Sequence, residues 1–348
     1  MAYLLPDCQG DRLLTHSSLA KDQPSKLKKE VTFMLISASR RTDLPAYYSD
    51  WLYTRFREGF VLVPNPMNPR QVSRVKLTPD VVDGIVFWTK NPLPMLPRLG
   101  ELKDYMYYFQ FTLTPYEKDI EPGLPDKGQK LVPAFKSLSE LLGADRVIWR
   151  YDPILLNEKY TAQFHLDAFA AMAKELHPYT RKVTVSFIDI DYRGVKGNLK
   201  ELALKDFPLS AQERLGSSLA QIARSYGLTI DTCAEKIDLL EYGIGKARCV
   251  DDRLFEKLLG CPLNLSKDKS QRQECGCVTS IDIGTYNSCP SSCRYCYANY
   301  SPARISANIN RHDPRSPLLL GPGVSPEDKV SDRTTESCRS GQLQIKGL

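Results

Sequence analysis

The sequence predicts an α/β protein built as a (β/α)8 TIM-like or partial barrel, and three observations predict it. Short runs of β-branched and aromatic residues alternate with amphipathic stretches from residue 33 onward, a pattern typical of a parallel sheet. Eight such runs are spread over roughly 250 residues, which fits a barrel better than a doubly wound sheet. No Gly-x-Gly-x-x-Gly turn follows the first run and no Gly-x4-Gly-Lys occurs, so dinucleotide-binding and P-loop folds lose support.

The expected strands are short apolar runs bounded by Pro, Gly, Asn or Asp. In chain order they cover residues 33–38, 60–63, 84–88, 107–113, 146–150, 182–188, 228–232 and 278–283. Apolar residues at helical spacing predict helices over 46–58, 127–142, 161–177, 209–226 and 252–260. The link at 64–83 is Pro-rich and poorly helical, and the link around 90–104 has only a weak helical pattern.

The two ends of the chain differ from its middle. Residues 1–32 are polar, end in the basic run KLKKE, and predict a disordered leader, with Met34 as an alternative start of the protein. Residues 300–348 hold several Pro, Ser and Arg residues without a period, and predict an extended wrap with a disordered tail from about residue 322. The expected barrel domain therefore spans 33–299 and includes a cysteine-rich loop at 275–299.

Composition excludes several classes of protein. The 348 residues are 42% hydrophobic and 25% charged, which allows a sizeable core and excludes global disorder. No apolar run approaches the ~18 residues of a membrane helix and no secretory signal is evident, so we expect a cytoplasmic protein without a membrane partner. The net charge of +6 is compatible with an anionic partner but does not predict one.

The ten cysteines are unevenly distributed, because nine lie beyond residue 230. Such clustering at one end of a long chain indicates a metal or cluster site more than a disulfide scaffold. Cys289, Cys293 and Cys296 follow the spacing Cys-x3-Cys-x2-Cys within CPSSCRYCYANY. Three thiolates on one loop can hold three irons of a [4Fe–4S] cluster and leave the fourth iron open to a small molecule. A zinc site is the weaker alternative, because zinc prefers four ligands in paired spacings.

This loop carries a resemblance to known proteins. Cys-x3-Cys-x2-Cys with Tyr295 before the last cysteine is similar to the radical S-adenosylmethionine signature, and CPSSCRYCYA resembles its form in spore photoproduct lyase. The stretch from Met34 to about Gly321 resembles an uncharacterised bacterial family of unknown function. Its hallmarks here are ISASRRTDLPAYY, VFWTKNP, RYDPI, DTCAE, CGC and YNSCPSSCRYCYANY.

The resemblance implies a [4Fe–4S] cluster on these three cysteines and S-adenosylmethionine on its open iron. The segment Tyr295–Tyr297 would contact the adenine. One electron, from a donor such as flavodoxin or ferredoxin, would yield a 5′-deoxyadenosyl radical that abstracts hydrogen from an unknown substrate. Two alternatives stay open, namely a nucleic-acid-binding repair protein by analogy with spore photoproduct lyase and a non-catalytic iron–sulfur or zinc protein.

The position of the loop departs from the usual order, in which the cysteines follow the first barrel strand. Here they follow the last expected strand, 278–283. If that strand pairs with 33–38, the barrel is circularly permuted and the loop still lies at its C-terminal mouth. The end of the first strand lacks the usual Gly-Gly-Glu segment. Ser39 and Asp43 are the candidates to replace it, and Arg40 or Arg41 is the candidate partner of the cofactor carboxylate.

Four more cysteines form a second candidate group, namely Cys233, Cys249, Cys275 and Cys277. Cys275 and Cys277 are two residues apart, so in extended chain both side chains face one way. The group predicts an auxiliary [4Fe–4S] cluster, with zinc and unligated buried cysteines as alternatives.

Polar residues at strand ends ring the mouth of a barrel and are the substrate candidates. Arg150 and Asp152 are the expected catalytic pair, because two opposite charges close together at one strand end indicate a specific role. Other candidates, each equally explained as a cap, turn or ion-pair residue, are Thr89, Lys90, Asn91, Thr112, Thr114, Tyr151, Asp189, Asp191 and Glu235. The four histidines show no metal-binding spacing.

Overall fold

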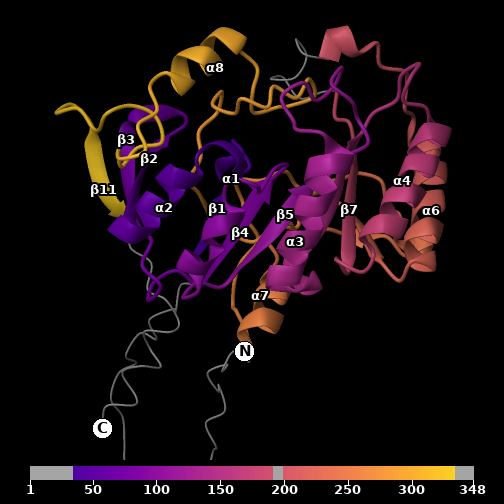
Figure 1. Ribbon diagram of the computed structural model, residues 1–348, viewed down its shortest axis with the longest axis horizontal. Coiled ribbons are helices and arrows are strands. Elements are labelled where there is room, and N and C mark those ends of the chain that lie inside the picture. Colours follow the sequence, from indigo (N-terminus) through magenta and orange to yellow (C-terminus); the bar gives the residue numbers. More distant parts are fainter. Residues whose placement is uncertain (1–33, 191–198, 334–348) are drawn as a thin grey trace, which may run out of the picture.

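The computed structural model describes residues 34–190 and 199–333, and its centre is an eight-stranded parallel sheet (Figure 1). The strand order is β10-β1-β4-β5-β6-β7-β8-β9. The bounds in that order are Ile281–Asp282, Leu35–Ala38, Gly84–Thr89, Tyr107–Thr112, Val147–Ile154, Lys182–Phe187, Thr229–Thr232 and Gly245–Lys246. The expected leader and residues 334–348 lie outside the described residues.

Strands β10 and β1 pair in parallel, with Ile36 opposite Ile281 and Ser37 opposite Asp282. This is the pairing that the permuted barrel predicts. The parallel sheet is therefore confirmed, whereas closure into a barrel is not shown. Within the described ranges no ladder joins β9 to β10, and one backbone hydrogen bond, from Val278 N to Val250 O at 3.2 Å, links the neighbouring segments.

The outer face of the sheet is apolar and covered by helices. Ile85 and Phe87 on β4 and Phe109 on β5 alternate with residues of the inner face, as the two-residue period of a strand requires. Helices pack against this outer face, and several stand beside β5 and β7 in Figure 1. These helices are α1 (Leu44–Tyr47), α2 (Ser49–Glu58), α3 (Val132–Leu142), α4 (Ala162–Leu176) and α6 (Leu209–Ser225).

The inner face divides into an apolar and a polar half. Helix α7 (Asp252–Leu259) fills the half near the N-terminal ends of the strands, where Phe255 stacks 4.9 Å from Tyr108. It lies so close to β4 that a Cβ on Gly84 would be 2.2 Å from the Phe255 ring. The opposite half carries Arg150 and Asp282, and a separate ion pair between Lys182 and Asp231 lies at the start of β7.

A second sheet has three strands in the order β11-β3-β2, with bounds Lys329–Arg333, Asn68–Lys76 and Phe60–Asn65. The expectation that 60–63 belongs to the main sheet is therefore wrong, and β9 takes the eighth place. Only two residues connect β2 to β3, which suffices for an antiparallel hairpin but not for a parallel crossover. The poorly helical pattern of 64–83 agrees with the structure, in which β3 occupies much of this link.

The expected helices are found with changed bounds, whereas the expected disorder from about residue 322 is wrong for Lys329–Arg333. Helix 46–58 is divided at Tyr48 into α1 and α2, and 127–142 begins with a π-helix at Lys127–Leu131. The expected wrap after residue 300 contains α8 (Pro302–Ile309), and β11 occupies part of the region expected to be disordered from about 322. Among the described residues, no helix combines the length and apolarity needed to cross a membrane.

Candidate metal and cofactor site

Three cysteines, here called the loop thiols, gather just after β10 at the C-terminal end of the sheet. They are Cys289, Cys293 and Cys296. Cys289 and Cys293 are buried, and each of the three sulfurs is close enough to another to influence its charge. Burial, together with the nearby Asp43 carboxylate, raises the pKa of Cys289 to about 11. Such thiols ionise when a metal binds them.

Hydrogen-bond donors surround these sulfurs. The Ser291 hydroxyl and the backbone N–H of Asp43 point at Cys289, and the backbone N–H groups of Ala298 and Asn299 point at Cys296. Hydrogen bonds to sulfur stabilise thiolates and tune the potential of iron–sulfur clusters. The donor set of the loop thiols therefore fits a soft metal or an iron–sulfur cluster.

The loop that bears these thiols is held from two sides. Tyr48 donates to Ser288 O at 2.5 Å and the Tyr47 hydroxyl lies 2.9 Å from the Ser291 hydroxyl, which fixes the loop to α1. On the other side Gly123 N donates to Ser291 O at 3.1 Å. A Cβ on Gly123 would be 2.7 Å from that oxygen, so this close approach requires glycine.

Tyr295, expected to contact a cofactor, is anchored by a buried ionic network. Its hydroxyl hydrogen-bonds Glu121 and accepts from Lys90 Nζ at 2.6 Å. Glu121 is fully buried and also accepts from Lys127 and, at 2.9 Å, from Thr114. Although burial raises the pKa of this carboxyl, Lys90 and Lys127 lower it to about 2. The network fixes the Tyr295 phenol beside Cys293.

The other expected cofactor residues lie around Asp282 of β10. Its carboxylate accepts from the Ser39 hydroxyl and, at 2.8 Å, from Arg40 N. Tyr297 donates to Arg40 O at 3.1 Å. The Arg40 guanidinium lies 5.5 Å from the centre of the Trp88 ring, and its Nη2 is buried without a hydrogen-bond partner among the described residues. An unpartnered buried guanidinium nitrogen is suited to an anionic ligand.

Asp43 serves the local fold in this structure. Its side chain caps α1 by accepting from Ala46 N at 3.0 Å, and it also accepts from Lys90 N at 2.7 Å. Burial raises the pKa of this carboxyl to about 6, against the opposing effect of these hydrogen bonds. Its expected role toward a cofactor stays a prediction.

Arg150 and Asp152, the expected catalytic pair, form an ion pair at the end of β6. Asp152 also accepts from Ser186, and although burial opposes ionisation, Arg150 holds the pKa of Asp152 below its usual value. Arg150 Nη1 donates to the sulfur of Cys249 at 2.8 Å. The pair thus reaches from the mouth of the sheet toward the second group of cysteines.

The second group, here called the inner thiols, is brought together by the fold. It comprises Cys233, Cys249, Cys275 and Cys277, all of which are free of disulfides. The sulfurs of Cys233 and Cys249 are 3.3 Å apart, and Val250 N donates to Cys277 at 3.4 Å. In the described part of the chain, no three His, Cys, Asp or Glu side chains already stand in the geometry of a single-ion site.

Sequence reasoning missed three residues of this region. Glu121 lies between elements in chain with no pattern, and Lys127 begins the predicted helix 127–142 with nothing to mark it as part of a site. Asp282 had a signal, because an acidic residue inside the apolar run VTSIDI must face a polar partner. Asp191 lies outside the described residues, and Glu235 accepts from Phe187 N at 2.8 Å at the end of β7.

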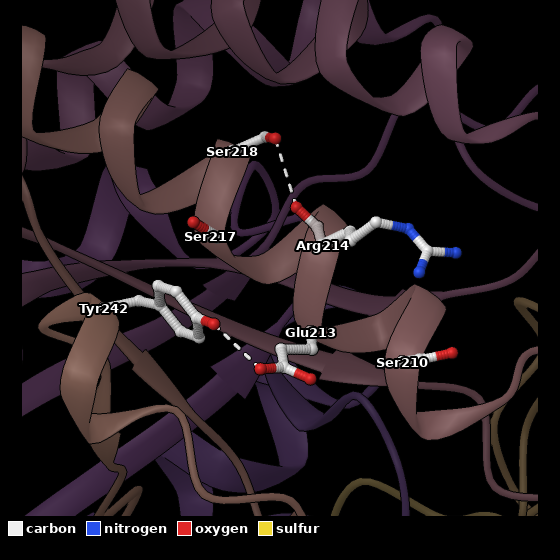
Figure 2. Close-up of a pocket in the computed structure, with 6 residues that line it drawn as sticks. All are labelled: Ser210, Glu213, Arg214, Ser217, Ser218 and Tyr242. Carbon is white, nitrogen blue, oxygen red and sulfur yellow. Dashed lines mark hydrogen bonds between the residues drawn. The ribbon is translucent and has the colours of Figure 1, made fainter.

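A surface hollow lies apart from all of these groups, on the outer side of α6 (Figure 2). Tyr242 and Glu213 point toward each other across it, with a hydrogen bond of 2.8 Å, and Arg214 extends away. It contains no thiol and no residue that the sequence singled out.

The fold and this region define an α/β protein whose parallel sheet carries two groups of buried thiols. The chain belongs to the family described as a domain of unknown function (DUF1848), which matches residues 35–298. No curated protein matches the chain.

Two solved structures have weak similarity to the chain. A putative alpha-L-fucosidase from Bacteroides thetaiotaomicron shares 10% identity over 70% of this chain and 89% of its own, with a TM-score of 0.27. The carboxyl transferase domain of Rhizobium etli pyruvate carboxylase shares 11% identity over 63% of this chain and 39% of its own, with a TM-score of 0.28. Scores this low carry no argument about function.

Proposed function

We propose that the protein is a radical S-adenosylmethionine enzyme whose [4Fe–4S] cluster is held by Cys289, Cys293 and Cys296. One observation carries the proposal: three thiols on a single loop, two of them buried and one half-buried, lie at the C-terminal end of a parallel sheet, the end where barrel active sites are built. The spacing of the cysteines, which leaves one iron without a protein ligand, supports it.

A cluster held by Cys289, Cys293 and Cys296 would, with one electron from an external donor, supply the reductive cleavage of S-adenosylmethionine that leads to hydrogen abstraction from the substrate and to 5′-deoxyadenosine. The chain's own residues would bind S-adenosylmethionine and orient it. The free Nη2 of Arg40 is the candidate partner of the methionine carboxylate. Asp282 holds Arg40 and Ser39 in place, and Tyr297 borders the same segment.

Lys90 and Tyr295 form the wall beside Cys293. The Lys90 ammonium would offset negative charge on that thiolate, and the burial of Cys289 and Cys293 would shield a bound cluster from solvent. Arg150 and Asp152 are the candidates that orient the substrate, because they border the same polar half of the inner face.

The test begins with protein reconstituted anaerobically with iron and sulfide, then reduced with dithionite in the presence of S-adenosylmethionine. We expect 5′-deoxyadenosine by mass spectrometry, and loss of this product in Cys293→Ala. Cys261→Ala, which changes a thiol outside both groups, is the matched control and retains the product. No product above the level of Cys293→Ala would contradict the proposal.

A further inference from the structure

The inner thiols come from three segments that meet only in the folded chain. Cys233 follows β8, Cys249 lies between β9 and α7, and Cys275 and Cys277 precede β10. Three of the four belong to one buried cluster inside the sheet, and Cys233 packs against it. Four soft donors concentrated in a dry interior match the ligand set of zinc or an iron–sulfur cluster.

The backbone conformation around Cys275 and Cys277 brings these two cysteines close to the segment that carries Cys249. The residue between them, Gly276, lies so close to the chain after β9 that a Cβ would be 2.8 Å from Ala247 O. Only glycine permits this approach, and it brings the Cys-Gly-Cys segment against the segment of Cys249. The hydrogen bond from Val250 N to the Cys277 sulfur follows from the same contact.

The charges nearby fit bound thiolates better than neutral thiols. Four thiolates around zinc or an oxidised four-iron cluster leave about two net negative charges. Arg150, which is also paired with Asp152, donates to the Cys249 sulfur at 2.8 Å. A cation at this place would offset part of the negative charge of such a centre.

We infer that Cys233, Cys249, Cys275 and Cys277 hold a second metal centre, zinc or an iron–sulfur cluster, that joins the two unpaired ends of the main sheet. The ligands lie on the β8–β9 side and on the β10 side, where Val278 N to Val250 O is the backbone link between them. Because no strand pairing joins β9 to β10 among the described residues, the metal–sulfur bonds of this centre would connect the two edges of the sheet. The inference goes beyond the proposed function and does not rest on it.

The test uses the full chain with the loop thiols removed by Cys289→Ala, Cys293→Ala and Cys296→Ala together. Metal and acid-labile sulfide are counted after expression in medium containing iron and zinc, and X-ray absorption identifies the coordinating atoms. We expect one centre per chain with sulfur as the dominant ligand. Iron with equal sulfide identifies a cluster, zinc without sulfide identifies a zinc ion, and either result supports the second centre.

A further substitution locates the centre. In the same background, Cys249→Ala or Cys277→Ala should reduce bound metal at least tenfold, while Cys261→Ala should leave it unchanged. If an inner-thiol variant does not fold, the absorption spectrum of the triple variant still decides the question. Substoichiometric metal, nitrogen and oxygen ligands only, or a Cys233–Cys249 disulfide in the peptide map would overturn the inference.

This experiment separates the second centre from the proposed function. Metal retained in the triple variant belongs to the inner thiols, whatever the activity of the native protein. Metal present in the native chain but absent from the triple variant belongs to the loop thiols, and its loss would overturn the second centre while leaving the proposed function intact.

Discussion

The two thiol groups lie on either side of β10 and are assembled in different ways. The loop thiols occupy one turn of chain, in which Cys296 N donates to Cys293 O at 3.0 Å. The inner thiols extend from Cys233 to Cys277 and meet only when β8, β9 and β10 are in place. A local motif can bind its ligand while the rest of the fold fluctuates, whereas a dispersed group couples its ligand to the stability of the whole sheet.

The largest expected effect tests this difference directly. Because the inner thiols join separate segments, Cys277→Ser should lower the melting temperature by on the order of 10 °C. Cys293→Ser should lower it by about a third of that. Anaerobic scanning calorimetry of both variants, with and without a chelator, is the measurement. Equal losses from the two variants would remove the distinction between the groups.

The next effect concerns the ionic network behind the loop thiols. The pKa of Glu121 is about 2 in the folded chain against about 4.5 when unfolded, so its ionisation stabilises the fold by about 3 kcal/mol. This stability is fully present above pH ~4.5 and is lost as pH falls through about 2. Glu121→Gln should therefore reduce stability at pH 7 and flatten the acid limb in urea unfolding followed against pH. An unchanged acid limb would show that the network does not carry this stability.

A pair of glycines offers a finer comparison of the two groups. Gly276→Ala would place a Cβ 2.8 Å from Ala247 O, and Gly123→Ala would place one 2.7 Å from Ser291 O. Each should cost about 1–3 kcal/mol, because backbone must shift. We expect Gly276→Ala to weaken metal binding at the inner thiols and Gly123→Ala at the loop thiols.

Gly100→Ala is the matched control for both substitutions, because nothing lies within 4 Å of its Cβ position. Metal content and urea unfolding of the three variants are the measurements. Loss of the same metal from Gly276→Ala and Gly123→Ala would contradict independent assembly of the two groups.

The smallest effect is expected far from either group. Strand β11 is exposed along its length and pairs only with β3 in the second sheet. Ending the chain after Gly323 should cost about 1 kcal/mol or less and leave the metal content unchanged. Loss of metal on this truncation, measured by elemental analysis, would show that the second sheet supports the site.

The parts of the fold and site that could be predicted from sequence are those indicated by the periodicity of apolar residues or by the spacing of cysteines. The pairing of β10 with β1 followed from the geometry of parallel strands, and the loop thiols from their spacing. Strand β9, at Gly245–Lys246, has only two residues and therefore no period to detect. Strand β3, NPRQVSRVK, is mostly polar and exposed, and its hairpin with β2 depends on a partner rather than on its own pattern.

The candidate site was predictable only where the residue types themselves indicate the chemistry. The cysteines and the pair Arg150 and Asp152 could be singled out, but the hydrogen bond from Arg150 to Cys249 joins residues 99 positions apart. Glu121 was invisible because its role comes from Lys90 and Lys127, which tertiary packing brings to it. Contacts of this kind depend on how distant strands and loops pack in the folded chain, and no local pattern specifies them.

The ladder between β1 and β10 has a consequence for biosynthesis. Ser37 and Asp282 are separated by 245 residues, so one edge of β1 stays without its neighbour until most of the chain has left the ribosome. The carboxylate that positions Ser39 and Arg40 arrives with that late segment, as does the cysteine loop. A nascent chain stalled before residue 282 therefore has neither the loop thiols nor the Asp282 carboxylate, so binding of the proposed cluster to the loop thiols has to follow synthesis of this late segment.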